Sequence, residues 1–178
     1  KKHGPDALMI LGSAHHNNEA SYALRKFAAF WGSNNIDHQA RICHSTTVAG
    51  IANTWGYGAM TNSMNDIRNS KCVFIIGENV CTSHPIAMQH ILTAKEENKA
   101  QIIVADPRFT QTSAFANKFL QFRSGTDVAL IYGLVNVILK NGWQDKSMIN
   151  DRTYGYRDLK KELKRYDLET VSDITGVP

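Results

Sequence analysis

The chain has 178 residues, of which 43% are hydrophobic and 20% charged, a balance typical of a globular protein with a core of normal size. The net charge is +4, and the basic residues are scattered except for one C-terminal group, Lys160, Lys161, Lys164 and Arg165. We interpret that group as the solvated face of a helix, so no nucleic-acid partner is expected. No apolar run reaches about 18 residues, so no direct membrane insertion is expected.

Three cysteines, Cys43, Cys72 and Cys81, are present without CxxC spacing, which argues against a zinc site and a disulfide framework. Cys72 stands at the start of a predicted strand, so we expect it in the core. The chain begins at Lys1 without a methionine and ends at Pro178, and we expect it to be an internal piece of a longer protein. The compartment is therefore left open.

Apolar runs alternate with longer helical patterns along the chain, which is typical of a parallel α/β structure. The predicted strands are residues 7–11, 72–76, 101–105 and 118–122. The predicted helices are residues 19–31, 45–53 with Ser45 as N-cap, 85–97, 127–140, and two short helices within 144–168. The segment 33–41 is expected to be irregular.

Polar residues follow three of the predicted strands. They are Gly77, Glu78 and Asn79 with Ser83 and His84 at the next helix start; Asp106 and Arg108; and Gly125 and Asp127 at another helix start. Ligands of parallel sheets bind at the carboxyl ends of strands, and helix N-termini favour phosphate. A carboxylate such as Asp106 or Asp127 could bond a ribose or the edge of guanine. The pattern therefore predicts a nucleotide-like ligand.

The alternative for these residues is purely structural, because Gly, Asp and Asn are common in turns and Asp127 could simply cap a helix. The sequence has no GxGxxG between a strand and a helix and no Walker A motif, which argues against NAD and against a P-loop ATPase.

Cys43 and His44 form a second candidate site, at or just before the predicted helix 45–53. The positive end of that helix would stabilise a thiolate, the form of cysteine that ligates metals. Soft sulfur suits molybdenum-like chemistry, and His44 could move a proton beside it. The alternative is that Cys43 is an ordinary small buried residue.

Several long motifs carry a resemblance to a known family. They are GSNNIDHQAR, ARICHSTTVAGIANTWGYGAMTNSMNDI (residues 40–67), FIIGENVCTSHPIAMQHI, IIVADPR, SGTDVAL and the terminal DITG turn. Together they cover nearly the whole chain and resemble the molybdopterin oxidoreductases, most closely the formate dehydrogenase large (alpha) subunits.

The resemblance implies a Rossmann-like, three-layer α/β fold with a mostly parallel sheet, of the type in domains 1–3 of formate dehydrogenase and DMSO reductase. It implies that residues 1–42 end a preceding α/β domain and that residues 43–178 form a domain binding molybdopterin guanine dinucleotide. The implied cofactor is bis(molybdopterin guanine dinucleotide) with molybdenum or tungsten. Cys43 would be the metal ligand with His44 beside it, and the strand-end residues would hold one guanine dinucleotide.

The implied reaction is oxidation of formate to CO2, a proton and two electrons, with His44 assisting in proton handling or positioning. Implied partners are formate, the remainder of the large subunit and an iron–sulfur electron-transfer subunit. A [4Fe–4S] cluster would lie in the missing N-terminal part, and the setting would be anaerobic respiration in a bacterial or archaeal cytoplasm or periplasm. The isolated chain is expected to be inactive and to hold no metal.

The choice of formate over nitrate depends mainly on the Cys43-His44 pair. A nitrate reductase or another molybdopterin oxidoreductase is the nearest alternative. A non-catalytic relative that keeps only the fold and a nucleotide-binding regulatory module are the alternatives from other classes.

Overall fold

The computed structural model describes residues 2–178; Lys1, the first residue of the predicted N-terminal domain, lies outside them. The chain forms two compact units, the first ending at Thr61 and the second spanning Asn62–Pro178. Cys43 and His44 therefore belong to the first unit, although the predicted domain boundary at 42/43 puts them with the strand-end residues. The division into domains within a longer protein stays a prediction.

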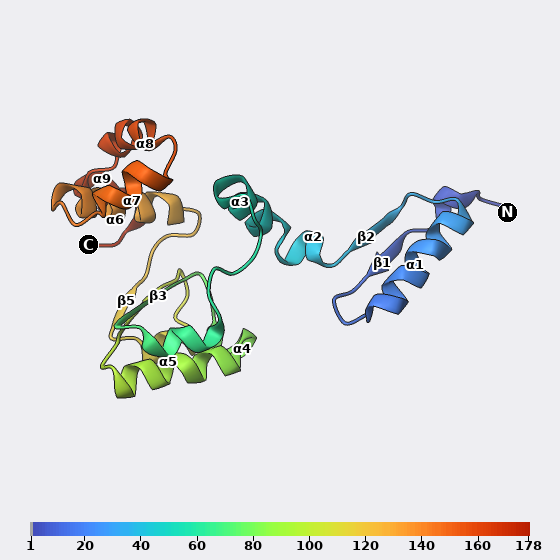
Figure 1. Cartoon of the computed structure of the whole chain (residues 1–178), viewed down its shortest axis with the longest axis horizontal. Coiled ribbons are helices and arrows are strands. Elements are labelled where there is room, and N and C mark those ends of the chain that lie inside the picture. Colours follow the sequence, from blue (N-terminus) through green and yellow to red (C-terminus); the bar gives the residue numbers. More distant parts are fainter. Residues whose placement is uncertain (1) are drawn as a thin grey trace. The chain divides into compact units, whose positions relative to one another are not determined.

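The first unit contains a short parallel sheet beside one long helix (Figure 1). Its elements are a 3-10 turn η1 (Pro5–Ala7), β1 (Ile10–Gly12), α1 (Asn18–Trp31), β2 (Ile36–His38), α2 (Ala40–Cys43) and α3 (Ser45–Trp55). The helix α1 begins where the Asn17 side chain accepts a bond from the Ala20 N–H at 2.8 Å, and it ends at Gly32, whose φ is 85°. The predicted helix 19–31 is therefore confirmed to within one residue.

The strand predicted at residues 7–11 is shifted, since Pro5–Ala7 form η1 and β1 covers Ile10–Gly12. Two further predictions in this unit are wrong. Residues 36–38 form β2 within the segment expected to be irregular, because this short strand completes its hydrogen bonds by pairing in parallel with β1. Ser45 is not the N-cap of α3: His44 holds that position, and the Ser45 hydroxyl donates to the Arg41 carbonyl at 2.6 Å.

The second unit is built on a parallel sheet with strand order β3-β4-β5. Its strands are β3 (Cys72–Ile76), β4 (Gln101–Ala105) and β5 (Lys118–Leu120). Its helices are η2 (Met64–Asn69), α4 (Val80–Ser83), α5 (Pro85–Glu97), η3 (Ser113–Phe115), α6 (Asp127–Lys140), α7 (Lys146–Arg152), α8 (Tyr156–Glu162), η4 (Leu163–Arg165) and α9 (Leu168–Thr175). The predicted strands 72–76 and 101–105 and helices 85–97 and 127–140 are confirmed residue for residue.

Alternation along the strands gives this unit three layers. Ile102 and Val104 of β4 are fully buried against the inner face of α5, which includes Met88 and Ile91. Ala105, the next residue, points to the opposite face and packs with Leu130 of α6. Figure 1 shows α6 gathered with α7, α8 and α9 near the C-terminus. The predicted α/β fold class with a parallel sheet is confirmed.

Smaller predictions differ from the structure. The strand β5 ends at Leu120 rather than at residue 122. The two short helices predicted within residues 144–168 are confirmed as α7 and α8, whereas the 3-10 turn η4 and the helix α9, which begins at Leu168, are not in the prediction. Cys72 is exposed rather than in the core, because it begins β3, an edge strand of the sheet.

The contact between α6 and α9 leaves no room for a side chain at Gly133. A Cβ placed there would lie 2.8 Å from Val171 Cγ1, well inside normal contact. We expect Gly133→Ala to lower the free energy of unfolding by about 1–2 kcal/mol, because overpacking outweighs the higher helix propensity of alanine. Urea unfolding measures this. Gly50→Ala in α3, where a Cβ meets nothing within 4 Å, is the matched control and should be neutral or stabilise by up to about 1 kcal/mol. Equal effects of the two changes would contradict the packing argument.

Candidate functional site

The carboxyl ends of β3, β4 and β5 lie in register. Ile76 pairs with Ala105 and Ala105 with Leu120, so the residues that follow the three strands, Gly77, Asp106 and Gln121, come at the same edge of the sheet. The Gly77 N–H donates to the Ala105 carbonyl at 2.9 Å, and the Asp106 N–H donates to the Leu120 carbonyl at 3.1 Å. The structure thus brings two of the three predicted strand ends together at the position where parallel sheets bind ligands.

The loop after β3 is held by a buried hydroxyl. Gly77 has a φ of 64°, which favours glycine, and the chain then reaches Asn79. Thr112, fully buried in the β4–β5 connection, donates its hydroxyl to Asn79 Oδ1 at 3.0 Å and accepts the Cys81 N–H at 3.0 Å. Asn79 in turn donates through its amide to Thr82 at 2.8 Å. The Asn79 side chain is therefore engaged by Thr112 and Thr82. Thr112, which is absent from the sequence prediction, ties the loop after β3 to the β4–β5 connection.

Glu78, Ser83 and His84 form a small polar cluster at the start of α5. The Ser83 hydroxyl donates to Glu78 Oε1, and His84 Nδ1 lies 3.4 Å from the same oxygen. His84 is the N-cap residue of α5 and makes no side-chain capping bond. The cluster is roughly half exposed, so the three side chains are accessible to a ligand.

The loop after β4 is shaped by Asp106. Its carboxylate accepts the Arg108 N–H at 2.8 Å, and the residue as a whole is buried, whereas Arg108 is exposed. Within residues 2–178 no hydrogen bond or ion pair engages the Arg108 guanidinium. This turn leaves a cation free beside the strand ends, where it could meet an anionic ligand.

The segment before α6 is fixed from the C-terminal side. Gly125 has a φ of 81°, and Asp127 is exposed in the first turn of α6, whose N-cap residue Thr126 makes no side-chain capping bond. The Arg123 N–H donates to the Thr175 carbonyl at 2.8 Å, and the Arg123 guanidinium bonds carbonyls of the terminal turn. An open cavity of about 580 Å³ lies here, lined by Pro107, Gln121, Phe122, Arg123, Ser124, Thr175, Gly176 and Pro178.

The sequence prediction missed Gln121, Arg123 and Thr112. The signal for Gln121 was available, since placing the three strand ends in one register puts it beside Asp106. Nothing local marks Thr112 or Arg123, because their partners lie 33 and about 50 residues away along the chain.

In the first unit, Cys43 ends α2 and His44 separates it from α3. Both side chains are exposed. The His44 N–H donates to the Ala40 carbonyl of α2 at 3.2 Å, and the His44 carbonyl accepts the Val48 N–H of α3 at 2.8 Å. Hydrogen bonds from both helices therefore fix the backbone next to Cys43. Two residues before Cys43, the Arg41 side chain bonds Asp37 at 2.9 Å and lowers the pKa of that carboxyl, with the His38 N–H adding to the effect.

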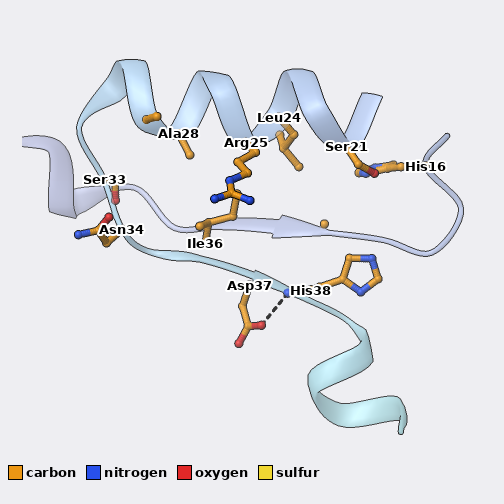
Figure 2. A pocket seen from close by; sticks show the side chains of 12 residues that line it. His16, Ser21, Leu24, Arg25, Ala28, Ser33, Asn34, Ile36, Asp37 and His38 are labelled. Atoms are coloured by element: carbon orange, nitrogen blue, oxygen red, sulfur yellow. Dashed lines mark hydrogen bonds between the residues drawn. The ribbon is translucent and has the colours of Figure 1, made fainter. Parts of the chain in front are cut away.

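Figure 2 shows a pocket between α1 and the β1–β2 sheet, with a volume of about 530 Å³. Arg25 and Ser21 of α1 and His38 of β2 are among the side chains that line it. None of the residues predicted as a site from the sequence lines this pocket.

Three further observations bear on the predicted partners. Along the described part of the chain, residues 2–178, helices are too short or too polar to cross a membrane. In that same part no three His, Cys, Asp or Glu side chains gather in a metal-binding group. In the basic C-terminal stretch, Lys161 pairs with Asp158 and Arg165 with Glu162, as expected for a solvated helix face.

Comparisons with known proteins all point to one family. The sequence matches the molybdopterin oxidoreductase family over residues 1–158. It is 44% identical over 97% of its length to the F420-dependent formate dehydrogenase subunit alpha of Methanocaldococcus jannaschii, and 40% identical over 99% to formate dehydrogenase H of Escherichia coli. It covers 26% and 25% of those proteins, so it spans about a quarter of their length.

A solved structure shares the fold. Acetylene hydratase from Pelobacter acetylenicus is 29% identical and superposes with a TM-score of 0.77, over 99% of this chain and 24% of that protein. The pterin cofactor of such a family would need accessible phosphate-binding donors and an accessible sulfur ligand. Within the second unit the helix starts at α5 and α6 and the free Arg108 are exposed, which fits phosphate binding, and within the first unit Cys43 is exposed, which fits a sulfur ligand. By its sequence and its fold, the chain belongs to the molybdopterin oxidoreductase family.

Proposed function

We propose that this chain is part of the catalytic subunit of a formate dehydrogenase that oxidises formate to CO2, one proton and two electrons. The observation that carries the proposal is the 39–44% identity, over nearly the whole chain, to formate dehydrogenase H and to the alpha subunits of three F420-dependent formate dehydrogenases. Cys43 and His44, which carry the choice of formate in the sequence, are exposed and held between two helices. The electrons would pass to an iron–sulfur chain in other parts of the enzyme.

We assign a different proposed role to each of the two units, with the metal ligand in the first unit and the nucleotide site in the second. Cys43 would supply the thiolate ligand to molybdenum or tungsten, and His44 would hold or move the proton released from formate. When bound, the metal and pterin would supply the two-electron chemistry, while the protein binds and orients them.

The strand-end residues would hold one guanine dinucleotide of the cofactor. Ser83 and His84 at α5 and Arg108 after β4 are placed to meet phosphates, and Gly77 lets the backbone approach them. Asp127 at α6 and Asp106 offer carboxylates to the guanine or ribose. Asn79, which bonds Thr112 and Thr82, would shape this site rather than contact the ligand.

The test is an anaerobic assay of the full-length protein, with formate-driven reduction of a viologen dye as the main readout. Nitrate-driven oxidation of the reduced dye and hydration of acetylene are run alongside. We expect formate activity alone. Nitrate activity without formate activity would leave the cofactor assignment and overturn the substrate. Acetylene hydration alone would place the protein with the hydratase, and no activity of any kind would favour the non-catalytic alternative.

Nucleotide binding by the isolated 178-residue chain is a second test, which does not need the intact enzyme. We expect it to bind GDP, the nucleotide half of the cofactor, at the strand ends, and to turn over no formate. Asp127→Asn should weaken GDP binding about tenfold or more, because a carboxylate paired with guanine N–H groups is lost. Formate turnover by the isolated chain would contradict the proposed need for the rest of the subunit.

A further inference from the structure

Glu78 occupies the donors that a phosphate would use. Its carboxylate accepts the Ser83 hydroxyl and lies 3.4 Å from His84 Nδ1. The single Ser83 proton is shared with the Asn79 carbonyl at 2.9 Å, and Ser83 Oγ is also 3.2 Å from His84 Nδ1. In the structure the carboxylate is thus the anion at the start of α5.

The surroundings favour an anion at this point. The helix α5 has 13 residues, Pro85 at its first position lacks an N–H, and its first intrahelical bond runs from Met88 to the His84 carbonyl at 3.2 Å. The N–H groups of Ile86 and Ala87 therefore have no partner within residues 2–178. Unpaired N–H groups and the positive end of the helix dipole stabilise a carboxylate here as they would a phosphate.

A phosphate and the Glu78 carboxylate cannot use these donors together. Ser83 has one proton to donate, and two negative charges within a few ångströms repel each other. From this competition, and resting on the proposed nucleotide role of the strand ends, we infer that Glu78 is a placeholder. It holds Ser83 and His84 ready while the site is free, and it must leave them when a phosphate binds. The side chain is 44% exposed, so rotation into solvent is open to it.

The placeholder reading predicts a sign opposite to that of a direct ligand. If the Glu78 carboxylate bonded the ribose hydroxyls, removing its charge would weaken nucleotide binding. If it competes with the phosphates, removing its charge strengthens binding. Glutamine keeps the shape and the acceptor oxygen of the side chain, so Glu78→Gln isolates the charge.

The experiment is calorimetric titration of the 178-residue chain with GDP and, separately, with guanosine. We expect Glu78→Gln to lower the Kd for GDP by about three- to tenfold, a range set by the partial exposure of the cluster. The Kd for guanosine should stay unchanged, because that probe carries no phosphate. A purely structural role for Glu78 would weaken both probes together.

Glu162→Gln is the matched control. Its side chain is 43% exposed and pairs with Arg165 at 3.1 Å, away from the strand ends in sequence and in its contacts. It should leave both Kd values within about twofold of wild type.

The outcomes separate the inference from the proposed function. GDP binding that is unchanged or weakened by Glu78→Gln overturns the placeholder and leaves the nucleotide site intact. Absence of GDP binding in both the wild type and Glu78→Gln overturns the nucleotide role of the strand ends, and the placeholder with it. Tighter binding of GDP without tighter binding of guanosine supports the inference.

Discussion

Replacing Cys43 by alanine in the full-length protein is expected to abolish formate-driven dye reduction and to lower the bound metal sharply. The physical reason is that an exposed cysteine between two helices is the proposed thiolate ligand, and alanine offers no donor to the metal. The change should not disturb the fold, since the side chain is exposed and the backbone bonds of Cys43 remain. Metal analysis and the anaerobic assay on one preparation measure both effects.

Cys72→Ala is the control for this prediction, because Cys72 is also an exposed free cysteine but begins β3 in the other unit. It should keep both metal and activity. His44→Ala should keep the metal and slow formate oxidation by roughly 10²–10⁴-fold, the range for loss of a general acid or base. A Cys43→Ala protein with normal metal content and activity would remove Cys43 from the site.

The strongest sequence signals predicted the framework well. The strands 72–76 and 101–105 are short, mostly apolar runs that are followed by Gly77 and Asp106, and the helices 85–97 and 127–140 begin at a proline and an aspartate. At these elements the hydrophobic pattern and the residues at the ends favour the same structure, and the tertiary contacts of the fold agree with it. The same prediction places the ends of β3 and β4 at one edge of the sheet, which the register of the parallel strands confirms, while the ligand role of the residues there stays a proposal.

Most of the positions that were predicted wrongly or missed are those whose structure depends on contacts distant in the sequence. The strand β2 has three residues and exists through its pairing with β1, so no local pattern marks it. Ser45 looks like a cap from its residue type, but the preceding short helix α2 lets its hydroxyl reach Arg41 instead. Thr112 resembles any polar loop residue until folding brings Asn79 and Cys81 to it. Hydrogen bonds across the fold, rather than local propensity, decide these positions.

The second large effect is expected when the buried Thr112 is replaced by valine. Thr112→Val keeps the size of the side chain but removes the hydroxyl, which leaves the Cys81 N–H without its partner and weakens the hold on Asn79. We expect the free energy of unfolding to fall by about 1–3 kcal/mol, the cost of an orphaned buried polar group. Urea unfolding measures it.

A second effect of Thr112→Val should appear in binding. The loop from Gly77 to Ser83 carries Ser83, one of the proposed phosphate donors. The Thr112 bonds help to tie this loop to the β4–β5 connection, together with the Thr82 hydroxyl, which donates to Gln111 at 3.2 Å. Loosening that loop should therefore weaken GDP binding even at temperatures where the variant is fully folded. Thr93→Val in α5 is the matched control: its hydroxyl donates to the Gln89 carbonyl at 2.9 Å on an exposed helix surface, so its stability should change by no more than about 0.5 kcal/mol. If the two valine variants unfolded alike and bound GDP alike, the Thr112 hydroxyl would have no part in organising the site, and the remaining bonds of the loop after β3, such as that of Thr82 to Gln111, would be enough to order it.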